Sequence, residues 1–141
     1  METETYVVPE RVVQRYLRTT LERHAGAYTP GSAAAFDVPE PEVALGSYLN
    51  RGRASGIEVV FTARAIYQRS EGQTIRIPYE EIVRTESQVV DKSEIASVTL
   101  VLRSGEKETV WIDGGSPARD ALQLHQFLLN LFSARLRRAT F

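Results

Sequence analysis

The sequence predicts an α+β domain in which a seven-stranded antiparallel β-barrel is capped by a C-terminal helix, with an extra helix at the N-terminus. Between residues 43 and 113, short runs of alternating apolar and polar residues are separated by turn residues, which is typical of strands. Residues 9–27 and 117–138 instead repeat apolar residues at helical spacing. The 141 residues are the usual size for one domain with a single core.

The first predicted element is an amphipathic helix from Pro9 to about Ala27. A proline is favoured in the first turn of a helix. Apolar and small residues recur on one side of it: Val12, Val13, Tyr16, Leu17, Thr20 and Leu21. Such a face packs on another surface, which belongs either to a later part of the chain or to another subunit. Residues 26–41 contain three prolines and predict an irregular linker. The expected division is therefore a helix and linker over residues 1–40 and a β-rich domain over 41–141.

Seven strands are predicted next, at residues 43–49, 57–62, 65–69, 73–78, 82–89, 95–103 and 108–113. Two hairpins are indicated by Gly72 and Gly105, each in a short polar connection between β-prone runs. Connections this short join antiparallel neighbours, because a parallel pair needs a long crossover.

The C-terminal helix is predicted between Pro117 and about Arg138, with Ser116 as its N-cap and Asp120 in its first turn. Its apolar residues cover an arc of about 220°, which is wider than one barrel mouth requires. Either the N-terminal helix or a second subunit must cover the excess. We expect a homo-oligomer whose interface includes Leu124, Phe127, Leu128 and Leu131.

Seven short antiparallel strands followed by one long amphipathic helix resemble the pleckstrin-homology (PH) fold, and more closely the bacterial PH-like domains. Phe61-Thr62, Ile66-Tyr67 and the Pro-Tyr-x-x-Ile step that ends at Ile82 occupy the places of similar packing residues in that family. The resemblance covers about residues 41–138. It implies a PH-like barrel and an oligomeric assembly, whereas packing patterns of this kind carry little information about function.

The composition and the missing motifs argue against several classes of function. The 17 basic and 18 acidic residues give a net charge of −1, which argues against a general nucleic-acid binder. The absence of cysteine excludes thiolate metal sites and thiol catalysis, and fits a reducing compartment. No signal-peptide pattern or membrane-spanning apolar run is found, so a cytoplasmic location is expected. No nucleophile, metal cluster or cofactor motif is recognisable, and we therefore predict a protein that is not an enzyme and uses no cofactor.

Arg51 and Arg53 are the candidate ligand-binding residues, in a glycine-containing segment between the first two predicted strands. The PH resemblance implies this position, because many PH domains gather basic side chains there around inositol phosphates. The alternative is an exposed turn with two solvated arginines. Elsewhere, Trp111 is expected in the core and His125 as a packed interface residue of the last helix.

The sequence thus favours a non-enzymatic protein-interaction module of PH-like fold that self-associates and whose protein partner is unknown. The alternative hypothesis is a peripheral membrane adaptor that binds anionic lipid headgroups through Arg51 and Arg53. These two functions make different demands on the surface.

Overall fold

The chain begins with a helical segment made of α1 (Glu10–Leu17) and a π-helical turn, η1 (Arg18–Glu22). The hydroxyl groups of Thr19 and Thr20 both donate hydrogen bonds to the Tyr16 carbonyl, at 3.3 and 2.6 Å. Side-chain bonds of this kind compete with the helical backbone pattern and accompany the widening of the helix here. The computed structural model describes residues 8–31, 36–51, 55–88, 97–113 and 117–139.

Five antiparallel strands follow in a sheet whose spatial order is the chain order. They are β1 (Tyr28–Pro30), β2 (Gly46–Leu49), β3 (Glu58–Phe61), β4 (Ala65–Ser70) and β5 (Gln73–Pro78). The β4–β5 connection has positive φ at both Glu71 and Gly72, as a tight hairpin turn requires. The first predicted hairpin is therefore confirmed.

A 3-10 turn, η2 (Tyr79–Glu81), leads to a second antiparallel sheet of β6 (Ile82–Gln88), β7 (Ser97–Leu102) and β8 (Lys107–Trp111). Gly105 has a φ of 90° in the β7–β8 connection, which confirms the second predicted hairpin. The register of β6 against β7 shifts between Ile82 and Arg84, at the start of the sheet.

The prediction of a closed seven-stranded barrel is wrong: the described residues form eight strands in two sheets, with no closed barrel. All seven predicted strands form in their predicted segments, with small shifts at their ends. The eighth, β1, lies in the predicted linker. Its three residues are too few to show a period, and Pro30 fits because β1 is an edge strand.

Side-chain amides join the two sheets along the edge of β8 that pairs with no strand. The Gln68 side chain of β4 donates through Nε2 to the Thr109 carbonyl and accepts through Oε1 from the Trp111 N–H, both at 2.9 Å. It thereby satisfies the free edge of β8 as a peptide group would. Nearby, Asn50 Oδ1 accepts from the Asp113 N–H, and the Arg51 N–H donates to the Asp113 carbonyl at 2.9 Å.

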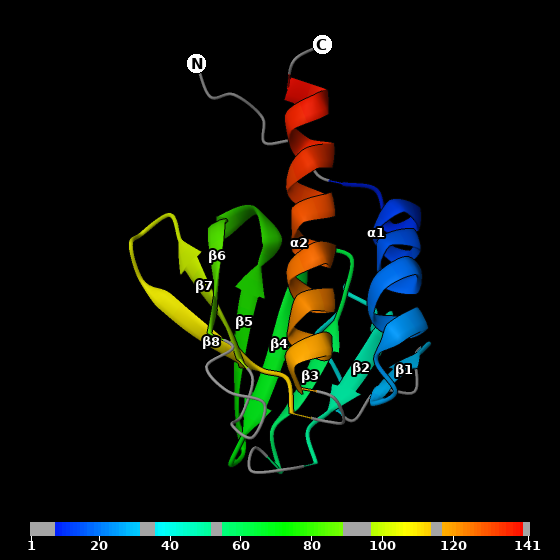
Figure 1. Cartoon of the computed structure of the whole chain (residues 1–141), viewed down its shortest axis with the longest axis vertical. Helices are drawn as coiled ribbons and strands as arrows, with labels where there is room; N and C mark the ends of the chain where they lie inside the picture. The colour runs from blue at the N-terminus through cyan, green and yellow to red at the C-terminus, as the bar shows by residue number, and fades with distance from the viewer. Residues whose placement is uncertain (1–7, 32–35, 52–54, 89–96, 114–116, 140–141) are drawn as a thin grey trace.

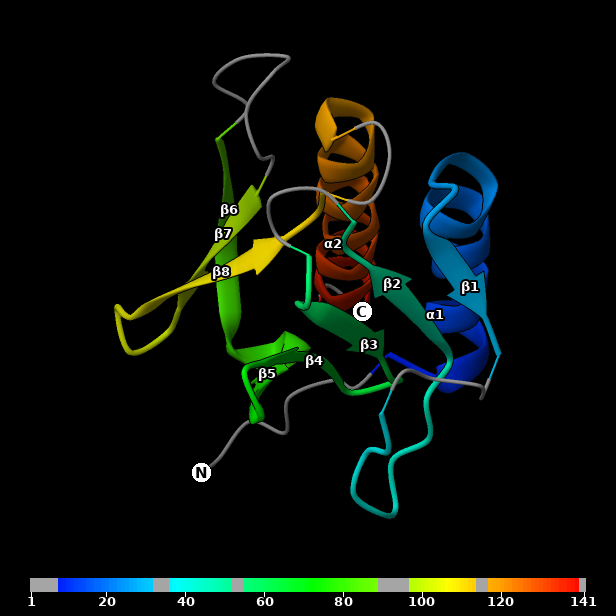
Figure 2. The ribbon, with the colours of Figure 1, turned by 90° about the horizontal axis from the view of Figure 1, so that it is seen from below.

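Helix α2 (Pro117–Ala139) passes in front of β3 and β4 in Figure 1, with β6–β8 to its left, and its bounds agree with the prediction within one residue. Figure 2 views the molecule from below. In this view β6–β8 lie on one side of α2 and α1 lies on the other, while β3 and β4 lie between these two sides. Phe127 lies at the centre, edge-on to the rings of Phe61 and Tyr79, with centroids 5.8 and 5.7 Å away.

The N-terminal helix packs within the same chain. Val13, Leu17 and Leu21 are almost fully buried and belong to the same apolar cluster as Leu124 and Leu128 of α2. This answers the question that the wide apolar arc of α2 left open, because α1 and η1 cover much of the excess.

A second, smaller cluster covers the outer face of the five-stranded sheet. Phe36 and Ala44, from the segment before β2, pack on Val60, Ala65 and Tyr67. Both faces of the central strands are therefore buried, which explains why the first four residues of β4, Ala65 to Gln68, are all buried rather than every second one.

Candidate functional site

A small cavity lies beside the C-terminal half of α2, where the turn before β4, the end of β5 and η2 meet the helix. Arg64 from the turn, Arg76 from β5 and Arg135 from α2 contribute three arginines to its lining. Glu80 of η2 supplies one carboxylate. The apolar part of the lining includes Val8, Pro78 and Leu131. We call this the arginine cavity; its volume is about 50 Å³.

Arg135 is held by backbone carbonyls rather than by a carboxylate. Its Nη1 and Nη2 donate to the carbonyls of Tyr79 and Ile82 at 3.1 and 3.3 Å, and its Cζ lies 5.2 Å from the centre of the Phe132 ring. Burial and the nearby Arg103 lower the pKa of Arg135, while Glu80 opposes this. The site therefore holds positive charge that is only partly compensated.

Arg76 belongs to a polar network on the outer face of the sheet. Its Nε donates to Glu42 Oε2 at 2.9 Å and to the Tyr67 hydroxyl oxygen at 3.0 Å. Glu42 also accepts hydrogen bonds from the Tyr67 hydroxyl and, at 2.8 Å, from Thr62 Oγ1. Burial raises the pKa of Glu42, but the hydrogen bonds from Arg76, Tyr67 and Thr62 outweigh it, so the pKa is lowered overall. This network anchors the segment before β2 to the sheet.

Arg64 is exposed, and its side chain makes no hydrogen bond or ion pair with another described residue. Its backbone is nevertheless fixed, because its N–H donates to Thr62 Oγ1 at 3.1 Å and its carbonyl accepts from the Tyr79 N–H at 3.0 Å. A guanidinium group with no partner among the described residues is thus attached to a fixed turn at the rim of the arginine cavity.

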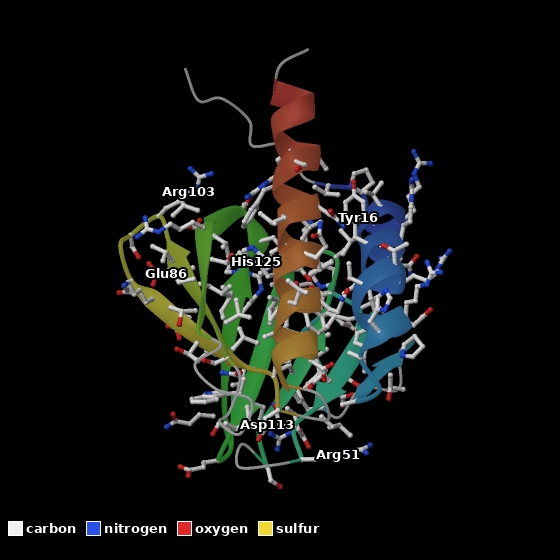
Figure 3. All side chains as sticks on the ribbon, in the orientation of Figure 1. Tyr16, Arg51, Glu86, Arg103, Asp113 and His125 are labelled. Atoms are coloured by element: carbon white, nitrogen blue, oxygen red, sulfur yellow. The ribbon has the colours of Figure 1, made fainter. Side chains whose placement is uncertain are left out.

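The predicted anion-binding residues lie elsewhere. Arg51 is exposed after β2, as expected, and its backbone joins Asp113. Figure 3 shows these two residues at the lower end of the molecule, whereas Arg103 lies toward the opposite end. Arg53 falls outside the described residues, so a paired Arg51–Arg53 face stays a prediction.

The four predicted interface residues are buried within the single chain. Leu124, Phe127, Leu128 and Leu131 are each at most 1% exposed and pack in the main core. Among the described side chains of α2, the large apolar ones that stay exposed are Leu122, at 59%, and Leu129, at 39%. A second copy that contacts the described part of this helix would meet these two residues.

Trp111 and His125 are the two other residues whose positions were predicted from the sequence. Trp111 was expected in the core, but this was wrong. The side chain is partly exposed, because it points away from the face that carries Val110 and Ile112. His125 packs between α2 and the second sheet, where its Nδ1 is hydrogen-bonded to the Thr85 hydroxyl of β6 (Figure 3). His125 Nδ1 and Thr85 Oγ1 are therefore hydrogen-bonded to each other.

Among the described residues, no group of three or more histidine, aspartate or glutamate side chains could hold a metal ion. None of the helices in the described ranges is both long and apolar enough to cross a membrane. No family model, curated protein or solved structure matches the chain. Function must therefore be inferred from the geometry.

Sequence reasoning missed the arginine cavity. Arg64, Arg76 and Arg135 come from three separate elements, and no spacing or motif links them along the chain. In the sequence, Arg135 belongs with Arg137 and Arg138 to a basic end of the last helix, which by itself does not indicate a cavity.

Proposed function

We propose that this protein is a non-enzymatic interaction module of PH-like fold that self-associates through the exposed face of α2. The PH-like assignment is supported by the order of the elements: the β2–β5 and β6–β8 meanders are followed by one long helix. This is the order that the family resemblance implies, with β1 and the N-terminal helix added before it.

Leu122 and Leu129 carry the proposal for self-association. They lie two helical turns apart on the side of α2 that faces away from the core, at 59% and 39% exposure. Apolar side chains at this spacing form a stripe that a second helix can cover. Covering both side chains removes apolar surface from water and so favours association.

The occupant that fits this stripe best is a second copy of the chain. Residues 121–134 contain no aspartate, glutamate, lysine or arginine. A two-fold interface brings each surface against itself, so a charged face would meet like charges, whereas an uncharged face does not. On the same helix, the Gln126 amide donates to Asn130 Oδ1 at 3.0 Å, which adds a neutral polar contact to the face.

Light scattering coupled to gel filtration tests the proposal. The unmodified protein should be a dimer at micromolar concentration, and Leu122→Asp with Leu129→Asp should make it monomeric, because association would bury two unpaired carboxylates. Val43→Asp is the matched control, since Val43 is 55% exposed on the segment before β2. The control should remain a dimer.

A protein that is monomeric at all these concentrations, or a double variant that still dimerises, contradicts self-association. The competing membrane-adaptor hypothesis predicts instead that the protein sediments with anionic but not with neutral vesicles, and that Arg51→Gln reduces this binding. Arg51 is exposed and could reach a headgroup, so this substitution tests the alternative.

A further inference from the structure

The arginine cavity has the composition of a site for a negatively charged group on an apolar stem. Three of its lining residues are arginines and one is a glutamate; Arg76 is paired with Glu42, so Arg64 and Arg135 against Glu80 leave the lining net positive. Val8, Pro78 and Leu131 add apolar surface beside the guanidinium groups. A ligand that satisfies both parts must combine a charge with hydrocarbon.

The guanidinium groups retain donors for such a ligand. Each arginine has five N–H donors. The printed contacts of Arg135 use Nη1 and Nη2 once each, and those of Arg76 use only Nε. Arg64 uses none of its side-chain donors with described residues. An anion at the cavity can therefore be bound without breaking the contacts that hold the fold.

The size of the cavity selects among anions. By the usual measure one water needs about 10–15 Å³, so 50 Å³ holds roughly four water-sized groups. This matches the end of an acidic side chain, with its carboxylate and one or two methylene groups. The cavity is far smaller than the pockets of about 300–1,000 Å³ that enclose whole small-molecule ligands.

We propose that the arginine cavity binds an aspartate or glutamate side chain of a partner protein. The inference rests on the proposed interaction function and specifies the chemistry of one partner contact. The carboxylate accepts hydrogen bonds from Arg64 and Arg135, and its methylene groups pack on Leu131 and Pro78. The partly compensated positive charge of Arg135 becomes balanced when the acidic side chain enters.

The first test is an NMR titration of the full-length, isotope-labelled chain with two neutral-ended peptides, acetyl-Ala-Glu-Ala-amide and acetyl-Ala-Gln-Ala-amide. Propionate and propionamide provide the same comparison without a peptide. The glutamate peptide and propionate should shift the amide signals of Ala63, Tyr79 and Leu131 saturably in the millimolar range. The two amides, which have the same shape but no charge, should not.

Three variants sharpen the test. Arg64→Gln should weaken binding of the glutamate peptide by about tenfold, the effect of one charge-assisted hydrogen bond. Glu80→Gln should strengthen it, because a like charge leaves the rim. Arg51→Gln is the control, since it removes an exposed arginine outside the cavity lining and should leave the affinity unchanged.

Four outcomes overturn the proposal: no local shifts, equal shifts with the neutral amides, equal weakening by Arg51→Gln and Arg64→Gln, or binding of propionate without binding of the glutamate peptide. The last result would assign the cavity to a free small acid. Light scattering separates this proposal from self-association. A monomer that binds the glutamate peptide contradicts only the dimer, whereas a dimer that does not bind it contradicts only the cavity assignment.

Discussion

Tyr28 and Gly46 show how one residue pair determines the packing at the edge of the larger sheet. Tyr28 lies on β1 and Gly46 begins β2, and the tyrosine ring passes directly over the glycine. A Cβ atom at position 46 would lie 1.9 Å from Tyr28 Oη and 2.3 Å from its Cζ. The Tyr28 ring also packs against the ring of Phe61, and the two ring centroids are 6.0 Å apart. The glycine is therefore needed for space.

We expect Gly46→Ala to lower the free energy of unfolding by about 3 kcal/mol, because the buried ring must move to admit the methyl group. Gly26→Ala is the matched control, since nothing lies within 4 Å of a Cβ there and the change should have little effect. Urea denaturation followed by tryptophan fluorescence measures both. Equal stability of the two variants would show that Tyr28 can leave Gly46 without cost.

At the scale of elements, the contact between the two sheets depends on the Gln68 amide. The β8 edge offers a carbonyl at Thr109 and an N–H at Trp111, and one side chain from β4 satisfies both. A buried edge without these partners would carry an unpaired donor and acceptor. Together with the contacts of Asn50 and Arg51 to Asp113, this side chain docks the second sheet without a continuous ladder.

Gln68→Leu should lower the free energy of unfolding by about 2 kcal/mol or more, because it leaves both backbone groups without partners. Gln73→Leu is the control in the same β4–β5 hairpin, where the side chain is exposed and the change should stay within about 0.5 kcal/mol. Chemical denaturation provides the comparison. Hydrogen exchange at Trp111 should become faster in Gln68→Leu alone, and unchanged protection there would contradict the docking role.

At the scale of the whole molecule, the N-terminal helix and the β-rich part share one core. Val13, Leu17 and Leu21 are at most 2% exposed and lie in the cluster that contains α2 and both sheets. This distribution argues that residues 41–141 depend on the preceding segment for folding, although the sequence alone favours a boundary near residue 40.

Deleting residues 1–27 should therefore abolish cooperative thermal unfolding, because the α2 surface that α1 and η1 cover would be open to water. A full-length pair provides the control: Leu17→Asp should strongly destabilise the protein, whereas Arg18→Asp, at the adjacent exposed position, should not. Circular dichroism on heating measures each variant. A shortened chain that still unfolds cooperatively would establish residues 28–141 as an independent domain.

Local pattern was sufficient to predict seven strands, both hairpins and the bounds of α2 from the sequence. Strand alternation, turn glycines such as Gly72 and Gly105, and helical spacing all act between near neighbours in the chain. The wide apolar arc of α2 was also visible, and it correctly required a cover from elsewhere. β1 was not predicted, because its three residues, which include Pro30, are too few to show a period.

The sequence by itself determined which segments become helices and strands, because those preferences depend on residues a few positions apart. Only the tertiary structure decided which of them meet. Gln68 reaches Trp111 across 43 residues, and Arg64 joins Arg135 at one cavity from two unrelated elements. It also decided that Leu124 and Phe127 are buried while Leu122 and Leu129 face solvent. Which side chains meet and which are buried depends on how the sheets and helices pack together to exclude water. No pattern among near neighbours in the chain determines that packing.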